Sequence, residues 1–376
     1  EISECLVGSE MCIRDSFYGG QYAPLAFLSY LVLYAGFGYD PFYFHMFSLL
    51  LHIGCVCLVW KLISSLLRVH GGVSEKQILY VNFITTLLFA VHPINVEAVA
   101  WISALKVLLY AFFYLLGLLC YLRYIRTSKI FYYVLTIGCF LCSFWGKEQA
   151  VTFPLALLIV DWFTNRNMKN LEVWSEKMSF LIMAFFFGII TVLSQGKGPY
   201  EMIFPLYQRL LFGCFALVEY ITKSLLPVNL NFFYPFPIVL GEEPPLHYYL
   251  YPVVLLFLMG WIIAYRNNRY LVFGVLLFLV NLLFSIHLFN MSRHAIVADR
   301  YMYLSYVGIA FLIANGIWWL RKRLSYFKAA LVFLFFYCFF LSVYTFHYTK
   351  KWENTTMVKK YTKEVLEKRL NGSNHL

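Results

Sequence analysis

Residues 328–348 read KAALVFLFFYCFFLSVYTFHY, and no Asp, Glu, Lys or Arg follows Lys328 in this stretch. An α-helix needs about 20 consecutive apolar residues to cross the hydrocarbon core of a bilayer. Closed β-barrels, the other structures that span membranes, alternate polar and apolar residues over shorter strands. The stretch therefore predicts a transmembrane helix.

The rest of the chain repeats this pattern. Of its 376 residues, 61% are hydrophobic and only 13% are charged, which is more apolar surface than a soluble domain buries. We therefore predict an all-α, polytopic membrane protein with about ten spans. The expected spans lie near residues 41–66, 79–92, 105–125, 130–145, 150–165, 178–195, 249–265, 270–289, 301–320 and 328–348.

The net charge of +11 comes largely from short basic clusters between the apolar runs. Such clusters are typical of cytoplasmic loops, and the absence of a soluble basic surface argues against a nucleic-acid partner. Ten spans then place the loops at 92–104, 146–149, 196–248 and 290–300 together on the outer side. The clusters are Arg123, Arg126 and Lys129; Arg166 and Lys169; Arg266 and Arg269; and Arg321, Lys322, Arg323 and Lys328.

Two further apolar stretches are expected to lie in the outer interface. Residues 24–36 are too short to span after an entry proline. Residues 207–225 are long enough, but Arg209, Glu219 and Lys223 interrupt them, and counting them as a span would invert every later loop. An amphipathic interfacial helix fits this pattern better.

Both ends of the chain stand apart from the predicted membrane domain at 17–348. Residues 1–16 contain CLVGSEMCIRD, which resembles a translated adapter sequence, so we exclude them from the fold and expect the native chain to continue upstream of Phe17. Residues 349–376 form a polar, basic tail that is expected to lie outside the cell or in a lumen. No repeat is visible in this tail, so a repeat domain is expected to be either absent or cut off after Leu376.

Ionisable residues next to a membrane are candidates for function because they are expensive to keep there. They concentrate in three of the predicted outer loops, HPINVEAVAWIS, WGKEQAV and MSRHAIVADRYMYL. The candidates are His92, Glu97, Lys147, Glu148, Arg293, His294, Asp299 and Arg300.

Each loop also has a structural explanation. Lys147 and Glu148 could form a local ion pair, and Asp299 and Arg300 could be a helix-terminal acid and a snorkelling base. Convergence of three such loops on one face favours a site, because Lys and Arg beside a dry surface suit a lipid phosphate.

Several stretches, in this order, resemble the membrane domain of the transmembrane and tetratricopeptide-repeat O-mannosyltransferases and their bacterial relatives, which are glycosyltransferases of the GT-C fold. The similarity extends over residues 20–350. The stretches are HPINVEAVAWIS, YAFFYLLGLLCYLRY, KEQAVTFPLALLIVDW, NLNFFYPFP and ADRYMYL.

The resemblance implies transfer of mannose or a similar hexose from a polyprenyl-phosphate donor to a hydroxyl of a protein or glycan acceptor on the extracytoplasmic face. Lys147, Arg293 and Arg300 are then expected to bind the donor phosphate, and His92 and His294 to line the site. The candidates for the acidic residue are Glu97, Glu148 and Asp299. No metal or other cofactor is expected, and the bacterial inner membrane is favoured over that of the endoplasmic reticulum.

The chain departs from the family pattern in its early part. In the family the usual catalytic acid lies just after the first span, which is upstream of Phe17 here. Asp40 is at the far end of the same loop and is not assigned this role, so the fragment is expected to be inactive as it stands. Val107 stands where relatives often carry an acid. Two alternatives remain: a transporter or flippase of a lipid-linked substrate, for which Lys106 and Asp161 are the only hints, and an inactive scaffold of the same fold.

Overall fold

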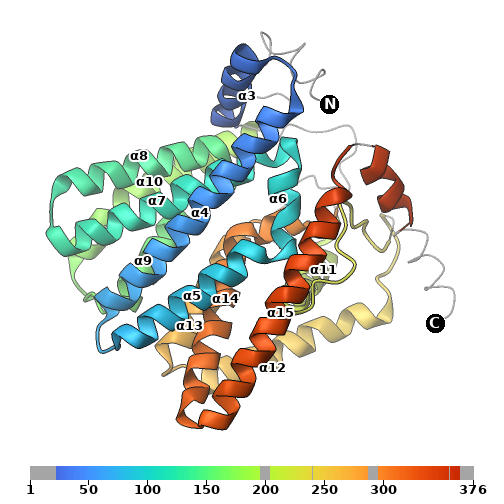
Figure 1. Cartoon of the computed structure of the whole chain (residues 1–376). Helices are drawn as coiled ribbons and strands as arrows, with labels where there is room; N and C mark the ends of the chain where they lie inside the picture. Colours follow the sequence, from blue (N-terminus) through green and yellow to red (C-terminus); the bar gives the residue numbers. More distant parts are fainter. Residues whose placement is uncertain (1–22, 195–203, 239, 287–294, 355, 365–376) are drawn as a thin grey trace.

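The computed structural model describes residues 23–194, 204–238, 240–286, 295–354 and 356–364. In these ranges the only β pairing is an isolated bridge between Tyr234 and Val297, and the other regular structure is helical (Figure 1). The all-α prediction is therefore confirmed. The longer helices are α3 (Pro24–Phe37), α4 (Pro41–His70), α5 (Glu75–Val91), α7 (Leu105–Thr127), α8 (Ile130–Gly146), α9 (Phe153–Phe163), α10 (Leu171–Ser194), α11 (Leu206–Leu225), α12 (Leu250–Ala264), α13 (Arg269–Leu282), α14 (Met302–Trp319) and α15 (Leu324–Lys350).

Each of the ten apolar runs forms a helix, but the helices differ in length. Among the described residues, six are long and apolar enough to cross a membrane. A seventh passes only if α5 is joined to the segment Pro93–Ala100 across a bend of 51°. Since α8, α9 and α13 have only 17, 11 and 14 residues, the polytopic membrane class is confirmed and the number of ten crossings stays a prediction. The six are Pro41–His70, Ile102–Thr127, Leu171–Ile190, Leu246–Ala264, Asp299–Lys322 and Leu324–Lys350.

The helix α11 has 20 residues but is not among the helices apolar enough to cross. This agrees with the interpretation of its three charged residues, and its place in the interface stays a prediction. The helix α3, which was also predicted to lie in the interface, has only 14 residues. It packs on α7 and α8.

Local sequence signals fix both ends of α4 and the start of α5. At the start of α4 the Asp40 side chain accepts a hydrogen bond from Phe42 N at 3.0 Å, and Pro41 is the first residue of the helix. The helix ends at Gly71, whose φ of 78° favours glycine. Ser74 then accepts from Gln77 N at 3.2 Å and starts α5, so the two helices pack as antiparallel neighbours.

Small residues let the central helices approach closely. A Cβ at Gly308 of α14 would lie 2.5 Å from the carbonyl oxygen of Gly274 in α13 and 2.7 Å from Phe278 N. In a membrane, where lipid is as apolar as the helix surface, such close backbone packing is a main source of association. The α13–α14 pair is therefore fixed by two glycines that face each other.

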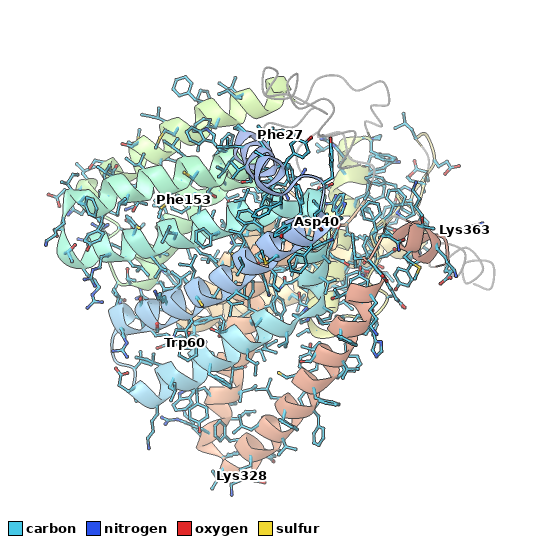
Figure 2. The ribbon with its side chains drawn as sticks, turned by 45° about the horizontal axis from the view of Figure 1, so that its top comes forward. Phe27, Asp40, Trp60, Phe153, Lys328 and Lys363 are labelled. Carbon is cyan, nitrogen blue, oxygen red and sulfur yellow. The ribbon has the colours of Figure 1, made fainter. Side chains whose placement is uncertain are left out.

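The helices run between two ends of the molecule. In Figure 1 the turn between α7 and α8 lies at the left, that between α4 and α5 at the lower left and that between α14 and α15 at the bottom, whereas the short helix α6 (Val96–Ala100) lies nearer the middle and the helix at 356–364 at the upper right. Figure 2 likewise places Lys328 and Lys363 far apart at opposite ends. We call the first the basic end and the second the site end.

Candidate functional site

Two of the predicted loops meet at the site end. Glu97 of α6 is fully buried and accepts a hydrogen bond from the backbone N–H of Arg300 at 2.7 Å. It also forms an ion pair with Arg300 Nη1. The two residues are 203 positions apart in the chain, so this contact joins HPINVEAVAWIS directly to ADRYMYL.

The third loop reaches the same place through aromatic rings. The Arg300 guanidinium lies 5.2 Å from the ring centroids of both Trp101 and Tyr301. Lys147 Nζ lies 4.6 Å from the Tyr301 ring. Cations are attracted to the faces of aromatic rings, so Tyr301 is shared by two of the predicted phosphate-binding residues. The Arg300 side chain keeps 20% of its surface exposed, but Lys147 keeps only 2%.

Asp299 is held by a tyrosine of the motif NLNFFYPFP. It is fully buried, and the Tyr234 hydroxyl lies 3.0 and 3.1 Å from its two oxygens. That hydroxyl also accepts from Lys223 Nζ at 2.9 Å and from Asn231 N at 2.7 Å. A tyrosine hydroxyl has one donor and two acceptor positions, so Tyr234 uses its full capacity to connect Asp299 to Lys223.

The place of Lys223 differs from the one expected from the sequence. In the sequence this residue is a charge that interrupts a surface helix, but in the structure Lys223 is 3% exposed and is also paired with Glu219 at 3.5 Å. The available signal was its spacing. Phe212, Ala216 and Tyr220 are buried on the same face of α11, and Lys223 follows one turn later on that face.

The remaining predicted residues are more scattered. Glu148 is half-buried at the start of the 3₁₀ turn Glu148–Thr152, which packs mainly against α8 and α10. His92 accepts from Ile94 N at 3.2 Å, its ring packs 4.2 Å from that of Tyr306, and it also lines a cavity at the site end. Arg293 and His294 lie outside the described residues.

Two neighbouring cavities open at the site end. One, of about 840 Å³, is lined by Trp101, Phe232, Phe233 and the helix at 356–364, and we call it the aromatic cavity. The other, of about 780 Å³, lies between α4 and α15 and reaches His92 and Val99; we call it the apolar groove. Both volumes suit a small-molecule ligand.

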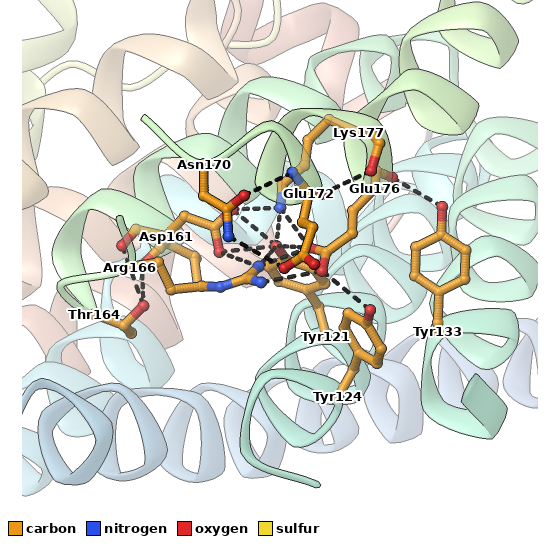
Figure 3. Close-up of polar contacts among 12 residues, drawn as sticks. Tyr121, Tyr124, Tyr133, Asp161, Thr164, Arg166, Asn170, Glu172, Glu176 and Lys177 are labelled. Carbon is orange, nitrogen blue, oxygen red and sulfur yellow. Dashed lines mark hydrogen bonds and ion pairs between the residues drawn. The ribbon is translucent and has the colours of Figure 1, made fainter. Parts of the chain in front are cut away.

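A second polar cluster, unconnected to the predicted site, lies among α7, α9 and α10 (Figure 3). Asp161 and Lys177 are fully buried and form an ion pair. Arg166 binds Glu176 through two contacts of 2.6 and 3.0 Å. The Tyr121 hydroxyl donates to both oxygens of Asp161 at 2.8 Å.

This cluster is electrically balanced, with two acids and two bases. The hydrogen bonds that Arg166 makes with Glu176 raise the pKa of the Arg166 guanidinium, so it stays charged. Asp161 was one of the two hints of a transporter, and its pairing with Lys177 gives it a structural explanation instead.

Fold and site together define an α-helical, polytopic membrane protein with a cluster of buried acids and bases at one end of the bundle. The chain is 30% identical over 183 residues to the protein O-mannosyl-transferase tmtc2 of Xenopus laevis, a match that covers 46% of this chain and 20% of that protein. It is 34% identical over 159 residues to human protein O-mannosyl-transferase TMTC2, which covers 40% of this chain and 18% of that protein.

A third relative is protein O-mannosyl-transferase Tmtc3 of Drosophila melanogaster, 28% identical over 171 residues, with 40% of this chain and 18% of that protein covered. No family model matches the chain, and no solved structure matches it. The matches span about a fifth of the length of these curated relatives. The resemblance to the transmembrane and tetratricopeptide-repeat O-mannosyltransferases is thus confirmed over about 40% of the chain.

Proposed function

We propose that this chain is part of a membrane glycosyltransferase that moves mannose or a similar hexose from a polyprenyl-phosphate donor to an acceptor hydroxyl on the extracytoplasmic face. The observation that carries the proposal is the contact between Glu97 and Arg300. It unites two motifs of the resemblance, with Lys147 beside them on the ring of Tyr301.

The chemistry requires a stabilised phosphate leaving group. Arg300 is the first candidate for this role, since its guanidinium is held in place by Glu97 yet remains partly exposed. Lys147 is more deeply buried and adds positive potential behind Tyr301. Glu97 is paired with Arg300, and Asp299 accepts a hydrogen bond from Tyr234. Because these contacts occupy their carboxylate oxygens, we assign both residues a positioning role rather than abstraction of the acceptor proton.

A protein acceptor is the simplest choice, because the relatives are named protein O-mannosyl-transferases. Those relatives come from animals and give no support to the bacterial inner membrane over the endoplasmic reticulum. That choice of membrane therefore stays a prediction. The pairing of Asp161 with Lys177 removes one of the two hints of a transporter, and Lys106 is the hint that remains.

The test uses the complete native protein, purified and reconstituted in liposomes with polyprenyl-phosphate mannose carrying a labelled sugar. We expect the label to appear on an added secretory-protein acceptor, and not when GDP-mannose replaces the lipid donor. Movement of labelled lipid across the bilayer without transfer would instead identify a flippase. If the protein neither transfers the sugar nor moves the lipid across the bilayer, the result would support an inactive scaffold of the same fold.

A further inference from the structure

The aromatic cavity and the apolar groove are parts of one continuous site. They share four lining residues, which are His45, Ala100, Trp352 and Glu353. The groove continues from these residues along α4 and α15, where the side chains of Leu49 and Phe346 are exposed on membrane-crossing helices. A ligand in the cavity can therefore extend into the groove and from there into lipid.

The two parts differ in chemistry. Apart from three histidines, Asn95, Lys350 and Glu353, the groove is lined by apolar or small side chains. The aromatic cavity combines the rings of Trp101, Phe232 and Phe233 with Lys359 and Lys363. Its other ionisable groups are Glu353, His45 and Tyr39, so two lysines share the cavity with one carboxylate.

The helix at 356–364 is a fixed wall of this cavity. The Tyr361 hydroxyl donates to Leu230 O at 3.1 Å, and the Thr362 hydroxyl lies 3.3 Å from Asn231 Oδ1. Residue 231 also binds the hydroxyl of Tyr234, which holds Asp299. The helix is thereby attached to the same loop as the candidate site, and it turns Lys359 and Lys363, four residues apart, toward the cavity.

We propose that the aromatic cavity binds the phosphorylated sugar head of a polyprenyl-phosphate donor, with Lys359 and Lys363 as its cations, and that the apolar groove holds the first isoprene units of the chain. This assignment rests on the proposed function. It adds the helix at 356–364, which lies outside the sequence motifs that carry the resemblance to the O-mannosyltransferases. Arg300 lies against the ring of Trp101, which lines the cavity, so its positive charge is next to the cavity wall.

The experiment measures equilibrium binding to the complete protein in nanodiscs of zwitterionic lipid. The probes are a long-chain polyprenyl monophosphate and its short homologue, geranyl phosphate. The head-group variant is Lys359→Gln with Lys363→Gln, and its matched control is Lys360→Gln on the same helix but outside the cavity. We expect the double variant to weaken binding of both probes by about tenfold, since these lysines are exposed.

The groove variant is Ser342→Phe, which fills the groove from an exposed position on α15, and its control is the adjacent Val343→Phe. We expect Ser342→Phe to weaken the long-chain probe by roughly tenfold and to leave geranyl phosphate unchanged. Equal effects of Ser342→Phe on both probes, or on neither, would overturn the groove assignment. Equal affinities of the lysine variant and Lys360→Gln would overturn the head-group assignment.

Other occupants give different results. Competition by inorganic phosphate as effective as by geranyl phosphate would point to a free anion site and refute a lipid ligand. Displacement of the long-chain probe by an acceptor peptide alone would assign the aromatic cavity to the acceptor. A protein that binds both probes as expected but transfers no mannose would keep this binding site and refute the proposed function.

Discussion

From the Arg300–Glu97 pair we predict how substitutions change the stability of the protein and its rate of mannose transfer. Arg300→Ala leaves the fully buried Glu97 carboxylate without its charged partner. Removing one member of a buried pair costs about 3 to 5 kcal/mol. We expect about 3 kcal/mol, the low end of this range, for two reasons. The Arg300 side chain is 20% exposed, and the backbone N–H of residue 300 still donates to Glu97 in the variant.

The companion variant is Glu97→Gln, whose amide oxygen can still accept from that backbone N–H. Its expected cost is about 1.5 kcal/mol, because the partly exposed Arg300 regains water. The double variant removes both charges, and we expect it to cost about 3 kcal/mol rather than the sum of the two. The coupling energy should therefore be about 1.5 kcal/mol.

Thermal unfolding of the detergent-purified complete protein checks these values. Arg300→Ala should lower Tm by roughly 6 °C, at about 2 °C per kcal/mol for a protein of this size. Mannose transfer per folded molecule should fall by roughly ten- to a thousandfold in Arg300→Ala and in the double variant. Additive stability effects would refute the coupling, and normal transfer per folded Arg300→Ala molecule would remove Arg300 from the site.

Three further predictions concern the orientation, the Asp299 cluster and the packing of the bundle. Single cysteines at Ser74, Asn167 and Asn267 should be protected from an impermeant thiol reagent in sealed vesicles, whereas cysteines at Gly198, Glu242 and Asn371 should react; a protected Glu242 position would show that α11 crosses the membrane. Tyr234→Phe should destabilise the protein by about 2 kcal/mol, because Lys223, Asn231 N and Asp299 all lose their shared hydroxyl; an unchanged Tm would contradict the connection drawn from these distances. Gly308→Ala should lower the free energy of unfolding by about 1 to 3 kcal/mol, because the new Cβ forces α13 and α14 apart. The control is Gly316→Ala on the same helix, where a new Cβ meets nothing within 4 Å, and it should leave Tm unchanged or higher. Equal effects of the two substitutions would disprove close packing at Gly308.

The candidate site was predictable in part. The residues Glu97 and Arg300 could be named from the sequence because charged groups beside apolar runs are rare and expensive. Their pairing could not be named, since 203 residues separate them and nothing in either loop specifies its partner. Lys223 was assigned to the wrong surroundings because a charged residue in an amphipathic helix is usually solvated.

The sequence by itself determined that the chain is helical and lies in a membrane. Each apolar run, including 328–348, became a helix because lipid offers no hydrogen-bond partner and the backbone must satisfy itself locally. Only the tertiary structure decided which charges meet. Arg166, assigned from the sequence to a cytoplasmic basic cluster, binds Glu176 in a balanced network. Such pairings depend on how helices pack, and packing follows side-chain shape and glycine contacts that hydropathy does not record.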